Sequence, residues 1–174
     1  MPIVDLKSRR RVNRRYLALT PRGCCFMNYR LDSLQPIAHW VIERYFGEGI
    51  SSLSPAQQTF LLVWCFSGEI DNGGFEQFFS NSMGDESLPT VHALHDVGAH
   101  ESARLLQRAN DMFGPGGPPT DFDERNEALS NLDDESQLIL ELINQEYFLT
   151  REDHLLLLEQ FVANHQNAFA IGAR

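Results

Sequence analysis

The sequence predicts an all-α protein: one compact multi-helix domain of about seven helices with a basic N-terminal extension. Apolar residues recur at intervals of three and four along most of the chain, which is typical of amphipathic helices. Glycine- and proline-rich breaks separate these segments, and no stretch shows strand alternation or a hairpin turn. A length of 174 residues with 43% hydrophobic residues suits a single folded domain.

The first half of the chain predicts three helical segments. Apolar residues at helical spacing from Leu34 to Tyr45 indicate a helix that ends near Gly47. Ser54, Pro55 and Gln57 stand at the N-cap, first-helical and capping-box positions of the next helix, whose run 60–66 is apolar all round and should form the buried centre. Residues 71–74 interrupt this pattern, and it restarts at Phe75 with Phe78, Phe79 and Met83.

The second half predicts four more helices. One begins at Leu88-Pro89 and ends at Gly98, and the next carries an apolar face over residues 105–113. After the break at residues 114–119, a short helix covers 123–132, and a longer one follows the acids at 133–135. Thr150 to Asp153 resembles a capping box for a last helix, whose inward side chains are Leu155, Leu158, Phe161, Val162 and Phe169.

Charge divides the chain into a basic extension, residues 1–30, and an acidic helical domain, residues 31–174. The extension holds eight basic side chains and one acid, a net charge of +7, whereas the domain holds six basic and 23 acidic side chains, a net charge of −17. An acidic body repels nucleic acid and anionic membranes and attracts basic proteins. The extension is either a basic arm that contacts nucleic acid or the acidic body, or a solvated tail preceding a true start at Met27; we favour the tail.

Composition excludes several classes of protein. No apolar run approaches the ~20 residues that span a bilayer, and the basic N-terminus lacks the apolar segment of a secretory signal. Three cysteines, Cys24, Cys25 and Cys65, form neither a disulfide framework nor a structural zinc site, which favours the reducing cytoplasm. Cys65 lies in the apolar run and is predicted to be a core thiol.

The histidines suggest a metal site only weakly. His92 and His95 share a helix face, but the break at Gly98 separates them from His100, so capping or surface roles are favoured. His165 is predicted to lie at the edge of the core with a partner. The sequence contains no nucleophile motif, and no catalytic residue is predicted. No metal and no cofactor is predicted.

The most unusual segment is Glu69–Gly84, which places carboxylates, amides and a glycine pair between apolar stretches. Its acids Glu69, Asp71 and Glu76 could supply paired carboxylates for acid–base chemistry. The favoured interpretation is a tight interhelical turn at Asn72 to Gly74. A phosphate loop is excluded because no lysine or arginine is near.

Runs of acids mark three places on the predicted surface, of which the third comprises Glu152, Asp153 and Glu159. Carboxylates three or four residues apart on a helix lie ~5–6 Å from one another, so such runs could present a phosphate-like potential, or could simply keep the protein soluble. The candidate partner-binding residues come from the first two runs: Asp121, Asp123, Glu124, Glu127, Asp133, Asp134 and Glu135.

At residues 72–84 the sequence resembles the bacterial dimeric DNA-mimic protein family, whose domain is otherwise catalogued as of unknown function. The matching residues are Asn72, Gly73, Gly74, Phe75, Gln77, Phe78, Phe79, Asn81, Ser82 and Gly84, and the resemblance continues at 93–100 and 118–125. It covers roughly residues 34–165 and has no counterpart of the basic extension. It implies an all-α fold, an acidic surface and, for one branch, a homodimer that occupies the DNA-binding face of a helix-turn-helix-type transcription factor.

The leading hypothesis is therefore a non-enzymatic acidic protein that binds a basic DNA-binding protein and competes with DNA. The first alternative is a small-ligand-binding or hydrolytic site formed by Glu69, Asp71, Asn72, Glu76, Gln77 and Asn81, which requires a concave pocket where these groups converge. The second is a structural module whose acidity serves solubility alone.

Overall fold

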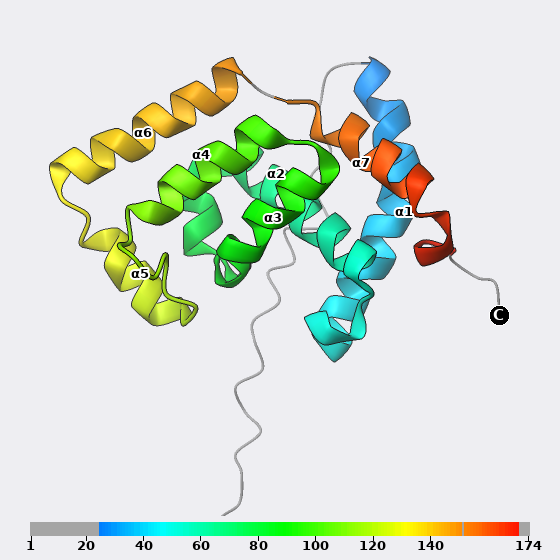
Figure 1. The fold of residues 1–174 in the computed structure, drawn as a ribbon, viewed down its shortest axis with the longest axis horizontal. Helices are drawn as coiled ribbons and strands as arrows, with labels where there is room; N and C mark the ends of the chain where they lie inside the picture. Colours follow the sequence, from blue (N-terminus) through cyan, green and yellow to red (C-terminus); the bar gives the residue numbers. More distant parts are fainter. Residues whose placement is uncertain (1–24, 151, 171–174) are drawn as a thin grey trace, which may run out of the picture.

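A computed structural model describes residues 25–150 and 152–170, and these residues form seven α-helices, three short 3₁₀ helices and no strand. The all-α prediction is confirmed. The α-helices are α1 (Cys25–Glu48), α2 (Pro55–Ser80), α3 (Ser87–Val97), α4 (His100–Asp111), α5 (Phe122–Ser130), α6 (Asp134–Leu149) and α7 (His154–Asn164) (Figure 1). The 3₁₀ helices are η2 (Ile50–Ser52), η3 (Ser82–Glu86) and η4 (Gln166–Ala168). The prediction for residues 1–24 lies outside the described residues, and α1 begins before the predicted domain boundary at residue 31.

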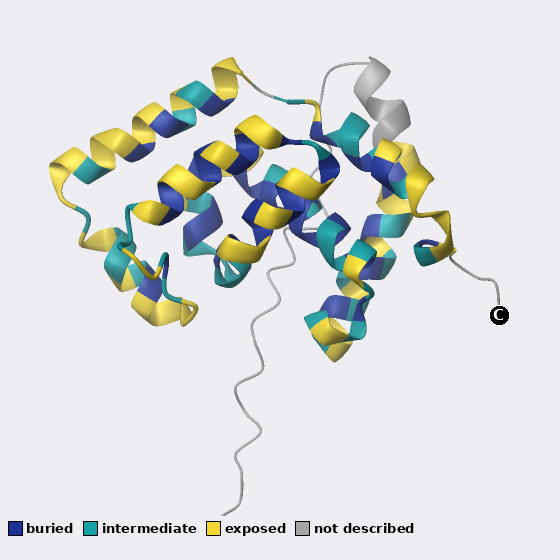
Figure 2. Cartoon of the chain, viewed as in Figure 1, coloured by how far each residue is buried: buried dark blue, intermediate teal, exposed yellow. Residues whose placement is uncertain are grey.

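Helix α2 forms the centre of the molecule, as its apolar run predicts. Phe60, Val63 and Phe66 are completely buried, and α2 packs against α1, α3, α5, α6 and α7. Figure 2 shows the buried residues on the inward sides of the surrounding helices, with exposed residues on their outer sides. Burial of this long helix accounts for much of the hydrophobic stabilisation of the domain.

The predicted interruption of α2 at the glycine pair is confirmed as a kink rather than a loop. Gly73 and Gly74 have non-helical backbone angles, and Gly74 has φ +69° with ψ −164°. Few residues other than glycine adopt this conformation. The helix resumes at once, so Phe75, Phe78 and Phe79 all enter the core.

Most predicted helix ends are confirmed. The backbone N–H of Ser54 donates to Oε1 of Gln57 (2.9 Å), as a capping box requires, and Gly98 ends α3 in the left-handed conformation (φ 91°). The capping box predicted at Thr150 is wrong. Thr150 closes α6, and Asp153 caps α7 by accepting from the N–H of Leu156 (2.9 Å). His165 ends α7 and is exposed, so its predicted burial at the core edge is wrong, but it has the partner that was also predicted: Nδ1 lies 2.8 Å from the carbonyl of Phe161.

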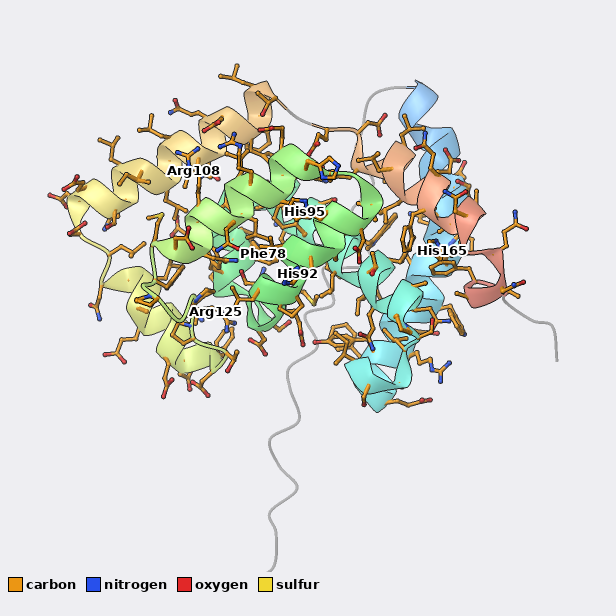
Figure 3. All side chains as sticks on the ribbon, viewed as in Figure 1. Phe78, His92, His95, Arg108, Arg125 and His165 are labelled. Atoms are coloured by element: carbon orange, nitrogen blue, oxygen red, sulfur yellow. The ribbon has the colours of Figure 1, made fainter. Side chains whose placement is uncertain are left out.

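Helices α5 and α6 follow one another at one end of the molecule, and α6 begins near the end of α5 (Figure 1). Helix α5 packs on α2 and η3, while α6 packs on α4 and α2. Arg104 and Arg108 of α4 bind the two carboxylate oxygens of Glu146 on α6, with both N–O distances 2.5 Å. Arg108 lies between α4 and α6 in Figure 3. These contacts fix the helices that carry the candidate acids.

Candidate functional site

The seven predicted partner-binding acids all lie exposed at the beginnings of two consecutive helices. Four stand at the start of α5 and in its first turns, and three stand at the start of α6. We call this set the acidic edge: Asp121, Asp123, Glu124, Glu127, Asp133, Asp134 and Glu135. Its role in binding stays a prediction; its exposure is what a binding role requires.

Two members of the acidic edge are also helix caps. Asp121 Oδ1 accepts from the N–H groups of Asp123 and Glu124 (both 3.0 Å), and Asp133 accepts from the N–H of Ser136 (2.8 Å). The hydrogen bond from the Ser136 backbone lowers the pKa of Asp133 below its usual value. Helix N-termini favour negative charge, so the same geometry that begins these helices also concentrates carboxylates there.

Little positive charge accompanies these acids. Residues 111–150 contain ten acidic side chains and one basic residue, Arg125, which is completely buried. Three further arginines with described side chains pair with acids outside the acidic edge: Arg44 with Glu48, Arg104 with Glu101 and Glu146, and Arg108 with Glu146. The acidic edge therefore presents its charge to solvent.

The third acidic run has a different use. Glu152 accepts from the backbone N–H groups of Glu101 and Ser102 (3.2 and 2.8 Å) at the start of α4, while Asp153 caps α7. Glu159 accepts from the hydroxyl of Ser33 on α1 (3.1 Å). These carboxylates join elements of the fold, and we do not include them in the acidic edge.

Arg125 holds α5 against the end of α2. Its Nε donates to the carbonyl of Phe79 (2.7 Å) and its Nη2 to the carbonyl of Asn81 (3.0 Å), both at the C-terminal end of α2. Nη1 donates to the carbonyl of Pro119 (2.8 Å), and Nη2 also pairs with Asp85 (2.7 Å). Figure 3 shows Arg125 on the side of α5 that faces the body of the molecule.

The glycines of the 72–84 segment leave room for polar partners. A Cβ on Gly84 would lie 2.6 Å from Nε of Arg125, and one on Gly74 would lie 2.5 Å from Oδ1 of Asn144. That Asn144 oxygen accepts from the N–H of Phe75 (2.9 Å) and so satisfies a donor exposed by the kink. Sequence reasoning assigned no role to Asn144, since only the fold brings α6 to the kink.

A buried carboxylate completes this segment. Glu69 is 4% exposed and accepts from Nε2 of Gln77 (3.0 Å) and Nδ2 of Asn81 (2.6 Å). Two amides thus compensate the desolvation of one acid. The segment therefore forms the α2 kink, part of the core and the Arg125 binding position, all of which are structural roles.

The alternative ligand site does not assemble. Glu69, Gln77 and Asn81 meet in the hydrogen bonds just described, but Asp71, Asn72 and Glu76 are exposed. Two surface hollows of the described residues lie elsewhere, one lined by residues 84–89 with Pro118 and Thr120, and the other between the starts of α2 and α3. Neither is lined by any of the six predicted residues.

The histidines lie apart from the acidic edge. His95 and His100 are exposed with their Nδ1 atoms 3.1 Å apart, and the described residues contain no group of three or more metal-binding side chains. The buried histidine is His154, whose ring nitrogens each lie 2.8 Å from a serine hydroxyl, Ser67 or Ser102. Sequence reasoning missed this network because its members come from three helices.

Cys65 should be unreactive in the folded protein. It is buried, as predicted, and burial raises the pKa of its thiol to about 12, with the Glu69 charge adding to the effect. We expect modification by a thiol reagent at neutral pH to be at least ~100-fold slower in native protein than in denaturant. Peptide mapping separates Cys65 from Cys24 and Cys25; equal rates at Cys65 in both states would contradict its burial.

Comparison with protein families identifies the relationship of this chain to known proteins. The DMP19-like protein family model matches residues 51–165, which include α2 to α7 and the whole acidic edge. The chain belongs to the DMP19-like family. DMP19 is a family of DNA-mimic proteins, as the sequence resemblance implies. Searches of curated proteins and of solved structures found no match.

The position of the family match clarifies what its shared residues do. The 72–84 segment lies inside the matched range, and the structure shows these residues forming the kink and the core of a DMP19-like domain. Helix α1 lies outside the match. None of the described helices has the length and hydrophobicity to cross a membrane.

Proposed function

We propose that this DMP19-like protein is a non-enzymatic, cytoplasmic interaction protein of transcription regulation in a bacterium. Its acidic edge binds the basic surface of a DNA-binding protein, such as a transcription factor, and excludes DNA from that surface. The observation that carries this proposal is the placement of seven exposed carboxylates at the starts of two consecutive helices, with the one arginine of that region buried. Membership in a family of DNA mimics supports it.

The proposed mechanism is electrostatic. Carboxylates spaced ~5–6 Å apart on a helix offer a row of negative groups to Lys and Arg side chains that otherwise contact phosphates. Such complementarity accelerates encounter and weakens as salt rises, because exposed charges are screened over about 8 Å at physiological ionic strength. Asp121 and Asp133 contribute charge while also fixing the helix starts.

Neutralising five acids of the acidic edge should weaken partner capture. The test variant is D123N/E124Q/E127Q/D134N/E135Q, which spares the two caps. The matched control, D32N/E43Q/E48Q/D71N/E76Q, removes the same number of exposed charges from α1 and the α2 kink. We expect the edge variant to lose at least about tenfold in affinity, about 1.4 kcal/mol, while the control stays near wild type.

The assay captures partners from a bacterial lysate at low salt and challenges the complex with duplex DNA. Retention of a DNA-binding protein that duplex DNA displaces supports the proposal. Equal loss of capture in both variants would reduce the effect to net charge. Loss in the control alone would contradict the proposal and move the binding surface to α1 or the α2 kink. Partners that ignore DNA would contradict mimicry.

The family resemblance also implies a homodimer, which we include in the proposal. Two copies would present two acidic edges to a partner that is itself symmetric. Sedimentation velocity of the purified protein across a concentration series tests this directly: a single monomeric species at micromolar concentration would remove the dimer from the proposal.

A further inference from the structure

Helix α6 carries apolar side chains on two opposite sides. Leu140, Ile143 and Tyr147 are buried against the body of the protein. Leu138, Leu142 and Leu149 are 60%, 50% and 85% exposed. A surface helix normally has a polar outer face, so a second apolar face indicates a contact surface.

The three leucines fall on one line. They are separated by four and seven residues, which places them on the same side of an α-helix, opposite the buried set. We call them the α6 ridge: Leu138, Leu142 and Leu149. Figure 2 shows exposed residues along this outer side of α6, at the margin of the molecule.

Acids accompany the ridge, and basic residues do not. Helix α6 contains Asp134, Glu135, Glu141 and Glu146 and no lysine, arginine or histidine. Arg104 and Arg108 neutralise Glu146 on the side facing α4, and their hydrogen bonds lower its pKa. Glu135 and Glu141 remain exposed beside the leucines. The ridge is therefore an apolar line flanked by negative charge and continuous with the acidic edge.

This charge pattern selects the occupant. In a pair of helices, residues flanking the apolar contact are stabilised by opposite charges and destabilised by like charges. A second copy of α6 would bring only carboxylates to that position. We propose that the α6 ridge docks an amphipathic helix of the partner, with an apolar line flanked by lysine or arginine. This inference rests on the proposed function and adds that recognition is partly apolar.

The salt dependence of binding distinguishes the α6 ridge from the acidic edge. Contacts between exposed charges weaken as salt rises, whereas burial of leucine side chains does not. Substitution of the ridge should therefore weaken binding at high salt as well as at low salt. Substitution of the acidic edge should matter most at low salt.

The test uses a defined probe. A fluorescent synthetic peptide of 16 residues, the length of α6, carries leucine at helical spacing flanked by lysine. A second peptide has the same composition in scrambled order, and a third has its leucines replaced by serine. Binding is measured by anisotropy against wild type, L138Q/L142Q and the control L88Q, since Leu88 on α3 is 42% exposed. Circular dichroism confirms that each variant is folded.

We expect the patterned peptide to bind wild type and L88Q alike and to bind L138Q/L142Q at least ~10-fold more weakly, also at 0.5 M salt. The scrambled and serine peptides should bind equally weakly to all three proteins. Equal binding of the patterned peptide to wild type and L138Q/L142Q would overturn the inference. So would a wild-type dimer that L138Q/L142Q converts to monomer, because a second copy would then occupy the ridge.

The same variants separate this inference from the proposed function. If L138Q/L142Q captures the DNA-displaceable partner as well as wild type does, the ridge inference is wrong and the proposed function stands. If the peptide result holds but duplex DNA displaces no captured partner, the ridge binds basic helices and DNA mimicry is wrong.

Discussion

Replacing Arg125 with methionine should destabilise the protein by about 3–5 kcal/mol, the largest effect we expect from a single substitution outside the apolar core. The side chain is completely buried and donates to four backbone carbonyls, those of Phe79, Asn81, Pro119 and Thr120, besides pairing with Asp85. Methionine fills similar space but donates no hydrogen bond to these carbonyls. Urea denaturation monitored by circular dichroism measures the loss.

The matched control is Arg108→Met. Arg108 also binds a carboxylate, Glu146, but its side chain is 43% exposed. Exposed ion pairs contribute about 0–1 kcal/mol, so the control should remain near wild type. If both variants lose the same free energy of unfolding, the hydrogen bonds of Arg125 to the end of α2 have no special importance. A loss confined to R125M would confirm that this arginine holds α5 in place.

Replacing Gly74 with alanine should cost about 2–4 kcal/mol. The backbone of Gly74 lies in a region that L-residues rarely adopt, and the new Cβ would stand 2.5 Å from Oδ1 of Asn144. Relief of that overlap requires Asn144 to move, which breaks its hydrogen bond with the N–H of Phe75. Thermal and urea unfolding both report the change.

Gly47→Ala is the control for this substitution. Gly47 lies within α1, and a Cβ there would have no atom within 4 Å. Alanine at such a position should be neutral or stabilising by up to about 1 kcal/mol, because it restricts the unfolded chain. G74A behaving like G47A would show that the kink tolerates a side chain. Combining G74A with Asn144→Ala should recover part of the loss if the overlap contributes to it.

Helix periodicity and local end signals predicted most of the fold. The capping box at Ser54, the glycine ending α3 and the interruption at Gly73-Gly74 each depend on neighbouring residues, so the sequence reveals them directly. The error at Thr150 arose where only a short connection separates two helices, α6 and α7. There, the residue that ends α6 stands three positions before the one that caps α7, and both positions favour small polar side chains.

The candidate site was harder to predict because contacts between distant segments decide which acids are exposed and which join elements of the fold. Acidic runs predicted exposure for the seven acids of the acidic edge, and the structure places them at the starts of two consecutive helices. Nothing local distinguished them from Glu152, which accepts two hydrogen bonds at the start of α4, fifty residues earlier in the chain. Sequence reasoning assigned no role to Arg125, because only the fold buries it against the end of α2.

The arrangement around Arg125 bears on how such a protein can diversify. The guanidinium of Arg125 joins α5 to the end of α2 and to Pro119 mainly by donating to backbone carbonyl oxygens, which every residue type supplies. The side chains at positions 123, 124 and 127 are exposed to solvent and are not among the hydrogen-bond partners of Arg125. Substitution of these three side chains can therefore change the binding surface while α5 keeps its position against α2. Binding specificity can change in this way at little cost in folding stability.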